Sequence, residues 1–183
     1  TILFMGMTLM SVLCYVPINK IVQKGKLQKK QMIMFAFVQF AVVYLVTSFS
    51  TGKVDTNNGL VFGILIVVLA AVPMAILGIL PQTIVADVAK EDEINTGENR
   101  DGMFFAARTF SMKLGQAVAT VLFTSLATIG VTYDQNGKML SSTGQGYRTA
   151  AIVCAVACFC AAIILSFYNE KKVMATLKDA NKA

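Results

Sequence analysis

The chain has 183 residues, of which 56% are hydrophobic and 14% are charged, and it contains neither Trp nor His. Soluble domains usually carry about 25% charged residues, so this composition excludes a soluble domain and favours a protein embedded in a lipid bilayer. The formal net charge of +6 does not indicate a nucleic-acid partner, because the basic residues flank apolar segments and lack the interleaved aromatic residues of a single-strand groove.

Apolar segments long enough to cross a bilayer follow one another along the chain. A transmembrane helix needs roughly 20 mainly apolar residues, and about five segments qualify. These segments are 1–22, 32–50, 60–80, 103–129 and 148–168. The sequence therefore predicts an all-α membrane protein in which residues 1–183 form one transmembrane bundle. Because Thr1 already lies inside an apolar run and no basic signal-peptide region precedes it, we expect the chain to be a fragment.

Basic residues concentrate in two places, the connection after the first span and the tail after the last. They are Lys20, Lys24, Lys26, Lys29 and Lys30, and then Lys171, Lys172, Lys178 and Lys182. By the positive-inside rule both segments are expected on the cytoplasmic side, which predicts a multi-pass protein of the inner (cytoplasmic) membrane with a cytoplasmic C-terminus. We interpret the first of these lysine-rich connections as a solvated loop rather than a ligand site.

The third span contains Pro73 and Pro81, each of which removes one backbone hydrogen-bond donor. The polar, acidic segment 81–102 that follows is predicted to be a cytoplasmic loop. Further along, the turn pair Asn136-Gly137 between short β-prone runs predicts a hairpin before the last span. In that last span the small residues Ala151, Ala155 and Ala162, with Ala157 and Ala161, are predicted to pack against neighbouring helices.

A polar stripe marks the fourth span. Lys113 lies about ten residues inside it, where an ammonium group is costly unless it faces an aqueous cavity or a partner charge. Thr109, Lys113, Gln116, Thr120 and Thr124 recur at helical spacing and share one face. We expect this face to line a substrate and cation pathway. The alternatives are a lysine that snorkels to the interface and threonines that join helices by hydrogen bonds.

Catalysis and metal binding are not indicated. Cys14, Cys154, Cys158 and Cys160 all lie in predicted spans, where cysteine behaves as a small apolar residue. A zinc site needs further ligands, and there is no His to supply one. Since paired intramembrane carboxylates and an activated Ser or Cys arrangement are also missing, we do not expect an enzyme, a cofactor or a metal site.

A series of short motifs runs from the end of the third span into the fourth. They are Leu80-Pro81-Gln82 with Ala86-Asp87, Thr96-Gly97, Arg100-Asp101-Gly102, Phe104-Phe105-Ala106 and Lys113-Leu114-Gly115. In this order they resemble the glycoside-pentoside-hexuronide:cation symporters, the family of the melibiose carrier within the major facilitator superfamily. The order of the spans is similar to helices eight to twelve of that fold, the C-terminal half without its first helix.

The resemblance implies roles for particular residues. Lys113 matches an intramembrane lysine that lies by the cavity and interacts with carboxylates of the other half. A cytoplasmic gate loop is matched by Asp87, Gly97, Arg100, Asp101 and Gly102. We expect Asp87 and Arg100 to form a latch, as an ion pair or a capping contact between this loop and neighbouring helix ends, that stabilises the outward-facing state. One departure is that Arg100 directly precedes Asp101, whereas relatives often place the arginine two positions before the acid.

The function that the resemblance implies is secondary active transport, with a sugar or glycoside and Na⁺ or H⁺ moving together by alternating access. It also implies that the coupling cation binds mainly to an N-terminal transporter half that this chain lacks. The expected partners are therefore the sugar, the cation, the lipid bilayer and that N-terminal half. Two alternatives stay open: a non-transporting membrane scaffold derived from a transporter half, and a transporter of a lipid-like substrate.

Overall fold

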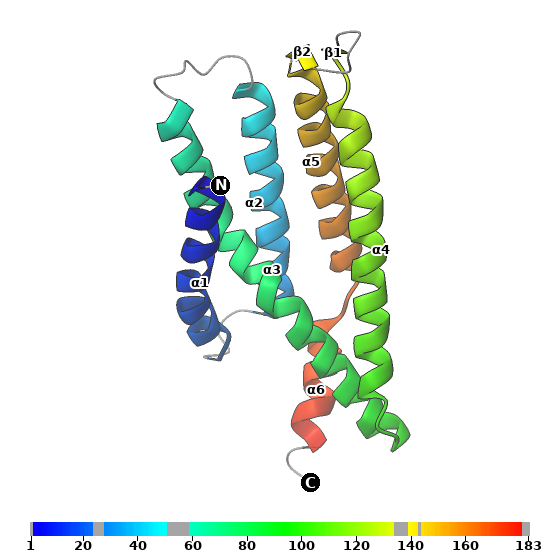
Figure 1. Ribbon diagram of the computed structural model, residues 1–183. Coiled ribbons are helices and arrows are strands. Elements are labelled where there is room, and N and C mark those ends of the chain that lie inside the picture. The colour runs from blue at the N-terminus through cyan, green and yellow to red at the C-terminus, as the bar shows by residue number, and fades with distance from the viewer. Residues whose placement is uncertain (1, 24–27, 51–58, 134–138, 143, 181–183) are drawn as a thin grey trace.

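The computed structural model describes residues 2–23, 28–50, 59–133, 139–142 and 144–180. It is an all-α bundle with one small hairpin (Figure 1), which confirms the predicted fold class. The elements in chain order are α1 (Ile2–Gln23), α2 (Lys29–Ser50), α3 (Gly59–Thr96), α4 (Asp101–Ala127), β1 (Val131–Tyr133), β2 (Met139–Ser142), α5 (Gln145–Ser166) and α6 (Glu170–Ala180).

Within the described residues, 4 helices are long and apolar enough to cross a membrane. They are Lys29–Ser50, Val61–Thr96, Asp101–Ala127 and Gln145–Ser166. Each of them overlaps one of the predicted spans, which begin at residues 32, 60, 103 and 148. The remaining predicted span, 1–22, is occupied by α1, which is not one of these four helices.

The core lies where α1, α2 and α3 meet. Its buried members are Ile18 from α1, then Met32, Ile33 and Ala36 from α2, and Ala75, Ile76 and Leu80 from α3. Ala36 and Ala75 are fully buried, and their small side chains let the α2 and α3 backbones approach closely. On its other side α2 packs against α5, where Ala155 and Ala162 are buried as predicted. Of the other alanines predicted to pack, Ala151 and Ala161 are partly buried and Ala157 is exposed.

The segment predicted as a cytoplasmic loop, 81–102, is mostly helical. α3 continues through Pro81 to Thr96, so the non-helical link before α4 is only 97–100. This corrects the prediction. Residues 82–96 include several good helix formers, and Lys90 and Glu93 form an ion pair at helical spacing. The helix ends at Thr96. The next residue, Gly97, has a φ of +74° that favours glycine, and its N–H donates to Glu93 O over 2.8 Å.

The hairpin and α6 lie at opposite ends of the bundle (Figure 1). β1 and β2 are antiparallel, with Val131 opposite Ser142 and Thr132 opposite Ser141, which confirms the predicted hairpin. Its predicted turn pair, Asn136-Gly137, lies outside the described residues.

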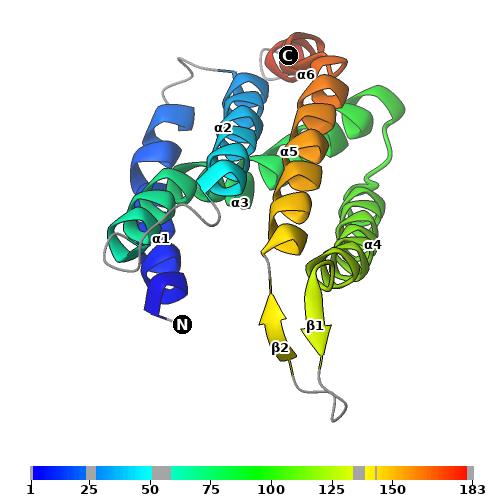
Figure 2. The ribbon, with the colours of Figure 1, turned by 90° about the horizontal axis from the view of Figure 1, so that it is seen from above.

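Figure 2 shows α4 at one edge of the bundle beside α5, whereas α1, α2 and α3 group together. α4 is therefore the least enclosed of the long helices, and none of its described residues is buried.

Candidate functional site

The predicted polar stripe lies on α4 and is exposed along its whole length. Thr109, Lys113, Gln116, Thr120 and Thr124 are all exposed, and α4 has no buried residue among those described. At about 1.5 Å per residue, Lys113 lies roughly 18 Å along the helix from its start at Asp101. The helix thus carries its charged group deep in the apolar segment, on a surface that the rest of the described chain leaves uncovered.

The threonine hydroxyls of the stripe bond to their own helix. Thr109 Oγ1 donates to Phe105 O, and Thr120 Oγ1 donates to Gln116 O, each over 2.8 Å. Thr124 Oγ1 does the same to Thr120 O. A hydroxyl has one hydrogen and two lone pairs. The hydrogen of each of these threonine hydroxyls is already used in the helix, so only its lone pairs remain available, as acceptors. The stripe therefore offers hydroxyl acceptors beside the three N–H donors of Lys113, a set that suits a polyol.

Lys113 forms no ion pair with any described carboxylate. The ion pairs of the described residues join Lys29 to Asp87, Lys90 to Glu93, and Arg100 to Asp92 and Glu98. The carboxylate partner that the sequence predicts for Lys113 is therefore not among these residues. That the partner belongs to another transporter half stays a prediction.

The predicted gate residues separate into two groups. Asp87 lies on α3, where its carboxylate pairs with Lys29 Nζ at the first residue of α2 over 2.5 Å, and both side chains are partly buried. Arg100 does not join Asp87. Its guanidinium binds Glu98 at 2.7 Å and reaches Asp92 only at 4.0 Å. Asp87 therefore pairs with the start of α2, whereas Arg100 pairs with residues close by in sequence. The role of these residues as a latch stays a prediction.

The other gate positions shape the link between helices. Gly97 ends α3, and Asp101 begins α4, where a negative side chain opposes the positive end of the helix dipole. Gly102 lies in the first turn of α4 and is exposed. These residues form a short connection rather than an extended loop, so they bring the ends of α3 and α4 close together.

A cluster that the sequence analysis missed lies where α2 begins. Glu170, the first residue of α6, is only 7% exposed. Its Oε1 accepts from Lys29 N over 2.9 Å and its Oε2 accepts from Lys30 N over 2.8 Å. The free N–H groups at a helix N-terminus favour such a carboxylate. Glu170 therefore caps α2 from the far end of the sequence.

Lys30 caps a second helix in return. Its Nζ donates to Ser166 O and to Tyr168 O, each over 2.6 Å, at the C-terminal end of α5. The carbonyl groups at a helix C-terminus favour a cation. The negative Glu170 at the start of α2 and the positive Lys30 at the end of α5 therefore each match the helix dipole that they face. Together with the Lys29–Asp87 ion pair, these contacts form a helix-end cluster of Lys29, Lys30, Asp87 and Glu170 that joins α2, α3, α5 and α6.

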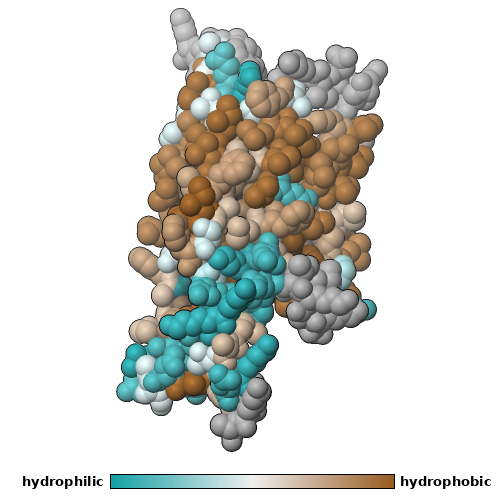
Figure 3. Space-filling model, turned by 180° about the vertical axis from the view of Figure 1, so that it is seen from behind, coloured by the Kyte–Doolittle hydropathy of each residue, from teal (hydrophilic) through white to brown (hydrophobic). Residues whose placement is uncertain are grey.

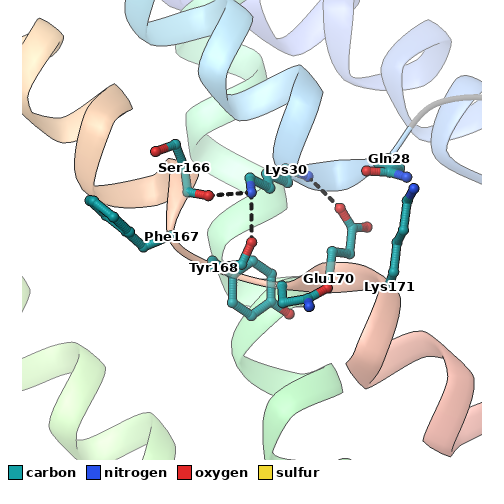
Figure 4. A pocket seen from close by; sticks show the side chains of 8 residues that line it. Gln28, Lys30, Ser166, Phe167, Tyr168, Glu170 and Lys171 are labelled. Atoms are coloured by element: carbon teal, nitrogen blue, oxygen red, sulfur yellow. Dashed lines mark hydrogen bonds between the residues drawn. The ribbon is translucent and has the colours of Figure 1, made fainter.

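A pocket of about 340 Å³ lies beside the helix-end cluster (Figure 4). It is lined by Gln28, Lys30, Ser166, Phe167, Tyr168, Asn169, Glu170 and Lys171. Burial, followed by the negative charge of Glu170, raises the pKa of Tyr168 to about 12. The phenol therefore stays neutral at physiological pH, and the charges around the pocket are those of lysine and glutamate.

Comparison with known proteins adds to this geometry. Residues 1–172 match the family model described as MFS/sugar transport protein. An uncharacterized symporter of Synechocystis sp. (strain ATCC 27184 / PCC 6803 / Kazusa) is 28% identical over 78 residues. That match covers 43% of this chain but only 13% of the symporter. No solved structure matches the chain.

Proposed function

Because the chain belongs to the MFS/sugar transport protein family, we propose that it is the C-terminal part of a secondary active transporter for a sugar or glycoside. Transport proceeds by alternating access, in which two transporter halves rock about a central site. The chain is a multi-pass membrane protein. Its lysine-rich connection after the first span and its lysine-rich tail lie on the cytoplasmic side of the inner membrane, as the positive-inside rule requires.

The polar stripe of α4 is the observation that carries the proposal. An exposed ammonium deep in an apolar helix is expensive against lipid, but not against water or a carboxylate. Lys113 is exposed, and no described carboxylate pairs with it. The stripe of α4 therefore faces the central cavity, where Lys113 pairs with a carboxylate of the N-terminal half. That pairing weakens as cation and sugar bind, which biases the equilibrium between the two access states.

The coupling cation, Na⁺ or H⁺, binds mainly to the N-terminal half. The matched Synechocystis protein is named a symporter, which supports cation coupling. That the N-terminal half holds the cation is what the resemblance to the sugar:cation symporters implies. The Lys29–Asp87 ion pair then acts at the cytoplasmic gate, where it closes one side of the pathway while the other is open.

A substrate panel on the full-length protein tests the proposal. Counterflow of labelled glycosides, pentosides and hexuronides, with and without Na⁺, is expected to reveal at least one transported sugar. Lys113→Ala abolishes its coupled accumulation, whereas Ser111→Ala, on another face of α4, leaves it within about twofold. Undiminished accumulation in Lys113→Ala contradicts the role of the stripe. Counterflow of a lipid-like substrate alone, or of none, favours the alternative transporter or the scaffold.

A further inference from the structure

The pocket beside the helix-end cluster lies where the chain leaves the apolar span. α5 ends at Ser166, and the non-helical residues 167–169 turn into α6. The pocket is formed between this turn and the start of α2. Its volume of about 340 Å³ lies at the small end of the roughly 300–1,000 Å³ of ligand sites, which suits a headgroup rather than a large metabolite.

The charges that face the pocket favour an anion. The ammonium of Lys30 has three N–H donors, of which two are used by Ser166 O and Tyr168 O. The carboxylate of Glu170 is already committed to the N–H groups of Lys29 and Lys30. Lys171, which borders the pocket from α6 (Figure 4), forms no ion pair with any described carboxylate. One donor of Lys30 and the whole ammonium of Lys171 therefore remain for a ligand.

The rim of the pocket is strongly apolar on one side. Phe167, which lines the pocket, is 83% exposed, and Ile164 one turn before it is 71% exposed. On this face of the molecule, hydrophilic side chains gather directly below a broad hydrophobic band (Figure 3). Exposed aromatic and aliphatic side chains next to lysines are the arrangement expected at the boundary between acyl chains and headgroups. A ligand that fits both sides has an anionic head and an apolar tail.

We propose that this pocket binds the headgroup phosphate of an anionic phospholipid from the cytoplasmic leaflet. Lys171 and the free donor of Lys30 bind the phosphate, and the acyl chains run along Phe167 and Ile164. The bound lipid reinforces the junction of α2, α5 and α6, because its headgroup contacts residues from both sides of that junction. This lipid site rests on the cytoplasmic placement of the lysine-rich tail under the proposed function and is independent of which substrate is carried.

Lipid titration of the full-length protein tests this site. Native mass spectrometry in detergent measures the binding of phosphatidylglycerol and, for comparison, zwitterionic phosphatidylcholine. The expected result is a preference for phosphatidylglycerol that Lys171→Gln weakens about 5- to 10-fold. Lys172→Gln removes the same charge from the next residue, which does not line the pocket, and is expected to weaken binding less than twofold.

Three outcomes overturn the proposal. If Lys171→Gln and Lys172→Gln weaken phosphatidylglycerol binding equally, the binding is due to general surface charge and not to the pocket. Each lysine near a membrane contributes to anionic lipid binding. Equal binding of both lipids removes the anion preference. Competition by soluble glycerol phosphate as effective as that by the lipid assigns the pocket to a free phosphate compound. Circular dichroism of both variants, expected to be unchanged, verifies that the comparison is made on folded protein.

Discussion

Gln39 Nε2 donates a hydrogen bond over 2.8 Å to Leu69 O, across the contact between α2 and α3. Leu69 lies four residues before Pro73, which has no N–H and so cannot make the normal helical bond to that carbonyl. In an apolar segment water cannot satisfy the free carbonyl, and a side chain from a neighbouring helix takes its place. A polar residue of α2 therefore allows α3 to pass through a proline as one helix.

Replacing Gln39 by Leu is expected to destabilise the bundle by about 1–3 kcal/mol, because Leu69 O then has no donor. The loss falls in the lower part of that range, since Gln39 Oε1 is itself buried without a partner among the described residues. Thermal unfolding in detergent measures it. In a Pro73→Ala background the backbone N–H returns, so Gln39→Leu is expected to cost less there. Equal costs in the two backgrounds contradict the assignment.

Removal of the cap on α2 gives a second prediction. Glu170→Ala leaves the N–H groups of Lys29 and Lys30 without their acceptors and is expected to cost about 1–2 kcal/mol. Glu170→Gln keeps one acceptor oxygen and costs less. Thermal unfolding measures both, and proteolysis of α6 reports its release. Asp179→Ala, at an exposed position of the same helix, is the control; a loss as large as that of Glu170→Ala disproves the capping role.

The ion pair between Lys29 and Asp87 is expected to act in transport through charge complementarity. Asp87→Lys places two cations together and lowers the initial rate of sugar uptake several-fold. The exchange variant Lys29→Asp with Asp87→Lys restores opposite charges and recovers part of that rate. Uptake is compared at equal amounts of protein in the membrane. If the exchange variant is no faster than Asp87→Lys, the pair has no role in the gate.

Gly146 sits against the backbone at the C-terminal end of α4. A Cβ there meets Leu126 O at 2.4 Å and Ala127 O at 2.8 Å, and backbone atoms cannot yield as a flexible side chain does. Gly146→Ala is therefore expected to destabilise the protein by about 1–3 kcal/mol, as overpacking does. Gly6→Ala in α1, where a Cβ meets nothing within 4 Å, is the control and is expected to be neutral or slightly stabilising. Thermal unfolding of the two variants decides between these outcomes.

The long helices could be predicted because their apolar length is a local property of the sequence. The stripe of Lys113 could be located for the same reason, since helical spacing alone puts its members on one face. Its role as a pathway stays a prediction. The cap of Glu170 on α2 could not be foreseen, because its partners lie 140 and 141 positions away and neither end carries a periodic pattern.

The extension of α3 was missed for a different reason. Charge and polarity in 81–102 indicate exposure to water, and an exposed helix and an exposed loop share that composition. The lysines of the first connection were read in the same way, as solvated charges, although Lys29 and Lys30 are partly buried in ion-pair and capping contacts. Composition therefore indicated that these residues are polar and lie outside the apolar spans, but it did not indicate their contacts.

α4 is secured mainly at its ends. The short link 97–100 attaches it to α3, and near its other end Phe123 lies against Tyr147 while Gly146 fits beneath its last turn. Its long middle section has no buried residue among those described. α4 is therefore held in place at both ends and exposed between them. Another domain can bind the exposed middle of α4 and dissociate from it without disrupting the packing inside this chain.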